Sequence, residues 1–164
     1  PTKLAGFTLS NGKGPGGVVC RSSVNLTIEN TRILNNAGAG IYCKGADKIT
    51  IHSNQIQGNS EAGIYLLNAS GMVTENLVER NSASGIYVIE CPEGVGIEGN
   101  TIRENNVSGV SINALSLQEG SLRRGTVATV LFNRIESNRA PEWGGGVNIN
   151  FSLSESERWH CRYR

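Results

Sequence analysis

The sequence predicts an all-β fold, a right-handed parallel β-helix of about six coils with three short strands in each coil. Three observations predict it: a repeat of 22–24 residues, three runs of alternating apolar and polar residues per repeat, and abundant glycine and asparagine. Glycine makes up 21 of the 164 residues, and both types tolerate the left-handed backbone of tight turns. We expect one solenoid domain over residues 1–150 and a C-terminal tail or cap over residues 151–164.

The repeat is clearest in the nine residues from Ile28 to Asn36, which read IENTRILNN. Similar segments begin at Ile51, Val73, Ile97 and Val130, so successive copies start 23, 22, 24 and 33 residues apart. A second element follows each copy, at 40–43 (GIYC), 63–66 (GIYL), 85–88 (GIYV), 109–112 (GVSI) and 146–149 (GVNI). A more degenerate coil fits residues 4–9 and 17–20, which makes six coils.

The three alternating runs of each repeat are typical of strands that bury one face. A unit of this length with three strands must return to its own start, so successive units stack through parallel strand pairing. A leucine-rich repeat has a similar period and is the main rival fold. It would show a Leu-x-x-Leu-x-Leu motif and a helical half, whereas this sequence shows Ile/Val alternation and no helical half.

Equivalent residues of successive coils should lie above one another, so each column of the alignment predicts a row in the structure. Four columns are apolar and dominated by β-branched residues, and these form the expected core. Two further columns are rich in asparagine, whose amide can bond neighbouring backbone at a bend and whose backbone tolerates positive φ. We expect two asparagine ladders, with metal or sugar binding as the alternative, at Thr31, Asn54, Asn76, Asn100 and Asn133 and at Asn36, Asn59, Asn81, Asn105 and Asn138.

Cys20 and Cys43 are neighbours in one inward column, so their Cα atoms should be one strand spacing apart, within disulfide range. Two free thiols packed as small hydrophobes are the favoured interpretation, and a disulfide is the alternative. The four cysteines match no zinc pattern, and His52 and His160 do not complete one. We therefore predict no metal and no cofactor.

Three tyrosines fall in the outward column of the Gly-Ile-Tyr strands. They either stack only on one another or form a platform for sugar rings. Insertions around residues 116–126 and 139–145 would flank this face as walls of a groove. We expect any ligand to be an extended, acidic oligosaccharide that contacts Tyr42, Tyr65, Tyr87, Arg123, Arg124 and Trp143.

Composition narrows the classes of partner. The net charge is +1 and the charged fraction is 18%, which gives no electrostatic basis for a nucleic-acid partner. No apolar run approaches the roughly 20 residues needed to span a bilayer. No signal peptide is visible, and the chain begins at Pro1 without Met, so we interpret it as a fragment.

The GFTLSNG opening at 6–12, the Gly-Ile-Tyr strands and the asparagine corners resemble the parallel β-helix repeats of the pectin-lyase-like superfamily. They are most similar to the broad class of bacterial right-handed parallel β-helix repeat proteins, and the resemblance covers residues 4–150. It implies the fold. It also implies a ligand face on the Gly-Ile-Tyr strands, because the enzymes of this superfamily hold substrate along the first strand face of each coil. Fold alone does not fix an activity.

The chemistry of those enzymes does not carry over. Polygalacturonase-like hydrolysis needs several aspartates on adjacent rungs, and the chain has one, Asp47. Calcium-dependent lyases need a carboxylate cluster beside a base, and only Glu90 and Glu93 are close together. The Asp-Pro-His-Asp signature of the epimerases is absent, and neither histidine lies on the tyrosine face. We predict no catalytic residue.

Two functions remain open. The favoured one is a non-catalytic segment of a secreted or cell-surface protein that binds polysaccharide or acts as a rigid spacer. The alternative is part of a polysaccharide-active enzyme, a lyase, glycoside hydrolase or epimerase, whose catalytic coils lie outside this chain.

Overall fold

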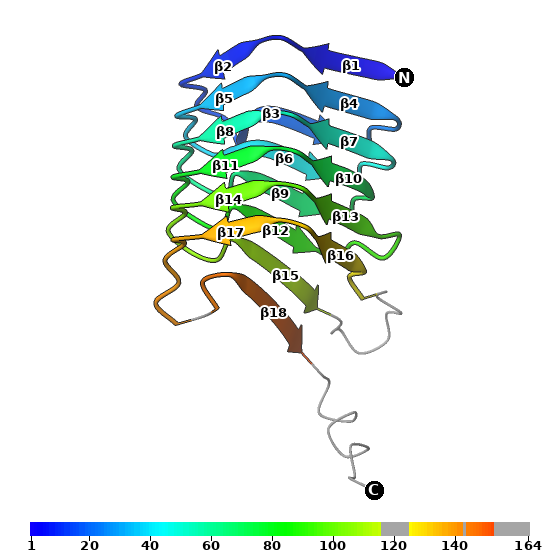
Figure 1. The fold of residues 1–164 in the computed structure, drawn as a ribbon. Coiled ribbons are helices and arrows are strands. Elements are labelled where there is room, and N and C mark those ends of the chain that lie inside the picture. Colours follow the sequence, from blue (N-terminus) through cyan, green and yellow to red (C-terminus); the bar gives the residue numbers. More distant parts are fainter. Residues whose placement is uncertain (116–124, 143, 153–164) are drawn as a thin grey trace, which may run out of the picture.

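A computed structural model describes residues 1–115, 125–142 and 144–152 of the chain. These residues form strands β1 to β18, with no helix among them. Each coil gives one strand to each of three parallel sheets, and the six coils stack as rungs along one axis (Figure 1). The predicted parallel β-helix is confirmed, and the described residues contain no long apolar helix that could cross a membrane.

We call the sheets A, B and C, in the order in which the chain meets them. Sheet A contains β1 (Thr2–Ala5), β4 (Leu26–Glu29), β7 (Ile49–His52), β10 (Gly71–Thr74), β13 (Val95–Glu98) and β16 (Ala128–Leu131). Sheet B contains β2 (Thr8–Ser10), β5 (Arg32–Leu34), β8 (Gln55–Gln57), β11 (Leu77–Glu79), β14 (Thr101–Arg103) and β17 (Arg134–Glu136). Sheet C contains β3 (Gly16–Arg21), β6 (Ala39–Lys44), β9 (Ile64–Leu67), β12 (Ile86–Ile89), β15 (Val110–Leu115) and β18 (Val147–Ser152). Coil 1 is β1–β3, coil 2 is β4–β6, and coil 6 is β16–β18.

The strands pair in the register that the column alignment predicts. Ile51 pairs with Ile28 in the coil before it and with Val73 in the coil after it, and all three side chains are fully buried. Because side chains alternate along a strand, this register repeats the same inward residue on every rung. The core is therefore built from parallel columns, mainly of Ile, Val and Leu, that run along the axis of the solenoid.

The two asparagine ladders are confirmed. In the first, the Asn76 side-chain amide donates to Asn100 Oδ1 at 2.9 Å, and Asn76 Oδ1 accepts from the amide of Asn54 at 2.9 Å. In the second, the amide of Asn59 donates to Asn81 Oδ1 at 2.9 Å. Each ladder amide also bonds backbone at the bend, so these buried polar groups are satisfied without a ligand.

The left-handed backbone at these bends is not where the sequence predicted it. The residue with positive φ is the one before each ladder asparagine, for example Ser53 (φ 53°), Glu75 (φ 55°) and Phe132 (φ 55°). The ladder asparagine is used instead for its side chain, which must point along the axis to reach the next coil. The cost of a left-handed non-glycine residue, about 1–2 kcal/mol, is offset by the hydrogen bonds that the ladder makes.

The last described strand runs slightly beyond the predicted solenoid. Strand β18 pairs with β15 as far as Ser152, two residues past the expected limit at 150. Residues 153–164, where a tail or cap is predicted, lie outside the described residues.

Candidate functional site

The Gly-Ile-Tyr motif of sheet C has a steric cause. A Cβ added at Gly63 would lie 2.4 Å from Val78 Cγ1 of the next coil, and one added at Gly40 would lie 2.4 Å from Ile56 Cγ2. Glycine is needed here because, at the corner between sheets B and C, the backbone passes so close to an inward side chain of sheet B that no Cβ fits. The next residue then faces the core and the residue after it faces outward, so the glycine column fixes the tyrosines on the outer surface.

The structure brings the three predicted tyrosines together. Tyr42, Tyr65 and Tyr87 are paired in register on β6, β9 and β12, and each is half-buried. Their ring centroids are 5.2 Å and 5.0 Å apart, with interplanar angles of 26° and 32°. Such a stack stabilises the sheet and also presents a row of aromatic surface at one ring per rung.

The middle tyrosine of the row is held neutral, and the row is anchored at one end. Burial raises the pKa of Tyr65, and so do the neighbouring Tyr87 and Tyr42. Its phenol therefore stays protonated at neutral pH, where it can both donate and accept hydrogen bonds. At the coil 5 end, the side-chain amide of Asn113 on β15 donates to the hydroxyl oxygen of Tyr87.

A second outward column on sheet C was missed by the sequence analysis. Arg21, Lys44 and Leu67 are paired in register two residues after the aromatic column, so they share its face. Arg21 and Lys44 are exposed, and they line a groove of about 510 Å³ together with Ser22, Gly45, Leu67, Asn68 and Glu90. The two-residue period would have found these cations, had it been extended from the tyrosines toward the C-terminal end of each strand.

The other three predicted ligand-binding residues, Arg123, Arg124 and Trp143, lie outside the described residues. The described cations beside the tyrosine row come from coils 1 and 2, whereas these three residues belong to the insertions of the last two coils.

A comparison with models of protein families identifies the family of this chain. The family model described as "right handed beta helix region" matches residues 2–157. The chain belongs to the right-handed β-helix family. A comparison with curated protein sequences finds no match. Among solved structures, a double mutant of the periplasmic alginate epimerase AlgG is similar, with a TM-score of 0.66 and 18% sequence identity. The similarity covers 90% of this chain and 38% of the epimerase chain, and at this identity it shows the fold alone.

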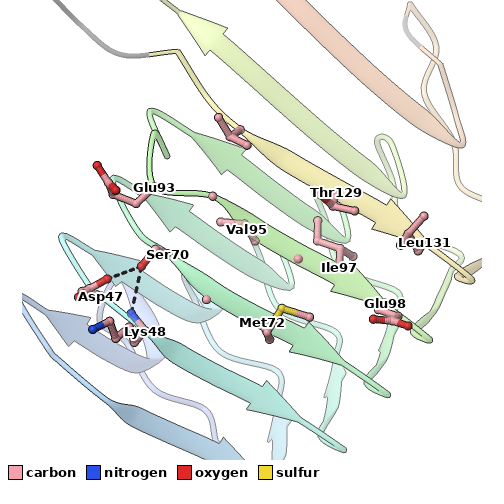
Figure 2. Close-up of a pocket in the computed structure, with 14 residues that line it drawn as sticks. Asp47, Lys48, Ser70, Met72, Glu93, Val95, Ile97, Glu98, Thr129 and Leu131 are labelled. Atoms are coloured by element: carbon pink, nitrogen blue, oxygen red, sulfur yellow. Dashed lines mark hydrogen bonds between the residues drawn. The ribbon is translucent and has the colours of Figure 1, made fainter.

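This right-handed β-helix has a second hollow, of about 580 Å³, on the outer face of sheet A (Figure 2). It exists because Gly96 interrupts an outward column that carries Met72 on one side and Thr129 on the other. A Cβ at Gly96 would meet Met72 Sδ at 2.4 Å, so the thioether covers the glycine. Asp47 and Glu93 lie at one end of the hollow and Glu98 at the other (Figure 2).

The polar groups of this hollow are partly tied to one another. The Ser70 hydroxyl donates to Asp47 Oδ1 and accepts from the Lys48 backbone N–H at 3.0 Å. Within the described ranges, no three His, Cys, Asp or Glu side chains gather closely enough to hold a metal ion.

His52 also lies on sheet A, away from the tyrosines. Its Nδ1 is 3.0 Å from Thr74 Oγ1, and its Nε2 is 3.0 Å from Ser53 Oγ. Glu75 Oε2 lies 3.8 Å from the same Nε2. Both ring nitrogens thus meet hydroxyl groups of the sheet surface, and the ring faces neither the tyrosine row nor the sheet A hollow.

Proposed function

We propose that this chain is a non-catalytic polysaccharide-binding segment, which holds an extended acidic oligosaccharide along the outer face of sheet C. The observation that carries the proposal is the stack of Tyr42, Tyr65 and Tyr87, in register on three successive rungs. The centroid spacing of 5.0–5.2 Å is close to the length of one pyranose unit, so a chain along the axis would meet successive rings.

The two cations of the groove support an acidic ligand, because they outnumber its one carboxylate, that of Glu90. Arg21 and Lys44 stand one rung apart beside the tyrosine row, at the spacing of successive sugars. The guanidinium of Arg21 can bind a uronate carboxylate in bidentate fashion, and Lys44 can bind the next one as a point charge. Alginate, the substrate named for the structurally similar epimerase, is a polysaccharide of the same acidic class. Arg123, Arg124 and Trp143 remain proposed contacts of the oligosaccharide.

The test is a calorimetric titration with oligouronates and with neutral oligosaccharides of equal length. We expect oligouronates to bind more tightly, and Tyr65→Ala to weaken binding about tenfold, because it removes the central aromatic contact and leaves a gap in the row. Tyr65→Phe keeps the ring and should retain most of the affinity. If the parent chain binds neither class of oligosaccharide, the proposed site is wrong and a rigid spacer becomes the better proposal.

A charge-matched control separates specific contact from net charge. Lys44→Ala should weaken oligouronate binding several-fold and reduce its salt dependence. Arg32→Ala removes one positive charge from the same coil, but Arg32 lies on sheet B, where its Nε bonds Gln55 Oε1 at 3.2 Å. Equal losses of affinity in the two variants would contradict the sheet C site.

The alternative is a segment of a polysaccharide-active enzyme. It is favoured by one observation, that the chain matches 38% of an epimerase chain and so leaves room for catalytic coils elsewhere. A product assay on oligouronates separates the two proposals, since the binding segment should leave the oligosaccharide unchanged. A periplasmic, secreted or cell-surface location fits either proposal, because acidic polysaccharides occur in these compartments.

A further inference from the structure

Two thiols meet inside the N-terminal end of the solenoid. Cys20 on β3 and Cys43 on β6 are in-register partners of neighbouring parallel strands, and both side chains face the core. Their exposed fractions are 3% and 0%. In-register neighbours of a parallel sheet lie about 4.8 Å apart at Cα, inside the range that a disulfide spans.

The pair is distinct from the third described thiol. Cys91 is also buried, but its Sγ accepts a hydrogen bond from the Ala69 backbone N–H at 3.3 Å and approaches the Leu66 carbonyl oxygen at 3.7 Å. Cys91 therefore meets backbone, whereas Cys20 and Cys43 meet each other. The contact between the two thiols lowers the pKa of Cys20 and raises that of Cys43, a sign that the two sulfurs interact directly.

We propose that Cys20 and Cys43 are an oxidation site, at which an inter-coil disulfide forms and staples coil 1 to coil 2. The oxidant is a small-molecule or protein disulfide. The Cys20 thiolate attacks one sulfur of that disulfide, forms a mixed disulfide and releases the first thiolate. The Cys43 thiolate then attacks Cys20 Sγ and releases the second, so two protein thiols are oxidised, one external disulfide is reduced to two thiols, and two protons are transferred.

Coil 1 supplies the access that buried thiols otherwise lack. Its inward residues Leu4, Leu9 and Val18 are partly buried, whereas Ile28, Ile33 and Ile41 of coil 2 are fully buried. A coil with fewer buried apolar contacts opens locally at lower free energy than a fully buried one. Opening of coil 1 exposes both thiols, and closure brings them back into register.

The experiment refolds the reduced, denatured protein in a buffer of oxidised and reduced glutathione and maps its disulfides by mass spectrometry. Trypsin releases Cys20 in the peptide 14–21 and Cys43 in the peptide 33–44. We expect these two peptides to be linked, with the mass of two hydrogens lost. The oxidised protein should melt roughly 5–10 °C above the same protein after reduction.

Three variants complete the test. Cys43→Ala should abolish the linked peptide and the difference in melting temperature, whereas Cys91→Ala should retain both. Cys161 lies outside the described residues, and Cys161→Ser should also retain both. The proposal is overturned if peptides 14–21 and 33–44 are not linked after refolding, if either thiol pairs with Cys91 or Cys161 instead, or if the linked protein melts no higher than the reduced one.

Discussion

Asn76 shows how much a single ladder residue does. Its side-chain amide donates to Asn100 Oδ1, to the Ile51 carbonyl and to the Thr74 carbonyl, each at 2.9 Å. Its Oδ1 accepts from both the backbone N–H and the side-chain amide of Asn54. One buried side chain thus satisfies polar groups of three successive coils, in a place that water does not reach.

We therefore predict that Asn76→Ala lowers the free energy of unfolding by about 2–3 kcal/mol, because it leaves buried backbone groups without partners. Asn106→Ala is the matched control, since Asn106 is exposed and lies outside both ladders; it should change stability by less than about 0.5 kcal/mol. Urea denaturation measures both values. Equal, small effects in the two variants would show that the ladder adds little to stability.

Glu79 is a charged residue in a position that alternation assigns to the surface. It follows the inward Val78 on β11, yet it is only 3% exposed. Arg103 Nε of the next coil lies 2.8 Å from one carboxylate oxygen, and Arg80 Nη1 lies 3.6 Å from the other. The two arginine side chains cover the carboxylate. Glu79 is therefore buried by a residue of the next coil, Arg103, and not by the position of Glu79 in its own strand.

At the scale of the element, the glycine column allows sheets B and C to approach each other closely at their shared corner. A Cβ at Gly63 would lie 2.4 Å from Val78 Cγ1 and 2.7 Å from the Gly85 carbonyl oxygen, so both a core side chain and a neighbouring backbone block it. The same contacts recur at Gly40, Gly85 and Gly109. The glycines therefore support the backbone conformation that places the tyrosines on the outer face.

Gly63→Ala should therefore destabilise the protein by about 1–3 kcal/mol through overpacking. It should also disturb the stack on Tyr65, two residues away, which near-ultraviolet circular dichroism would detect. Gly14→Ala is the control: nothing lies within 4 Å of an added Cβ there, and we expect no loss of stability. A Gly63→Ala protein as stable as the parent would mean that the corner relaxes without cost.

For the whole molecule, stability should fall from the centre of the solenoid toward its ends. Val147 and Ile149 of β18 are 40% and 51% exposed, although their column partners Val110 and Ile112 on β15 are 0% and 6% exposed. A coil in a solenoid is stabilised by its neighbours, and within the described residues coils 1 and 6 each pair with one other coil only.

Hydrogen exchange should follow this gradient. Backbone amides of β7–β14 should be the most protected, and those of β1–β3 and β16–β18 should exchange faster through local opening. Oxidation of Cys20 and Cys43 should slow exchange in β3 and leave β16–β18 unchanged. Uniform protection along the chain, measured by mass spectrometry on peptic peptides, would contradict a coil-by-coil gradient and indicate a single cooperative unit.

The sequence by itself determined the repeat, the strand alternation, the two ladders and the shared face of the tyrosines. This was possible because in a solenoid each residue's neighbours are its own equivalents one period away, so a column of the alignment is already a list of contacts. Tyr42, Tyr65 and Tyr87 could be placed together for that reason, although they are 22–23 residues apart in the chain.

Only the tertiary structure decided what depends on the shape of the corners and on contacts between different columns. It moved the left-handed backbone to the residue before each ladder asparagine, buried Glu79 under arginines, and opened a hollow over Gly96. A residue's own column says which way its side chain points. How closely the next column approaches depends on turn geometry and side-chain size in three dimensions, which the period alone does not contain.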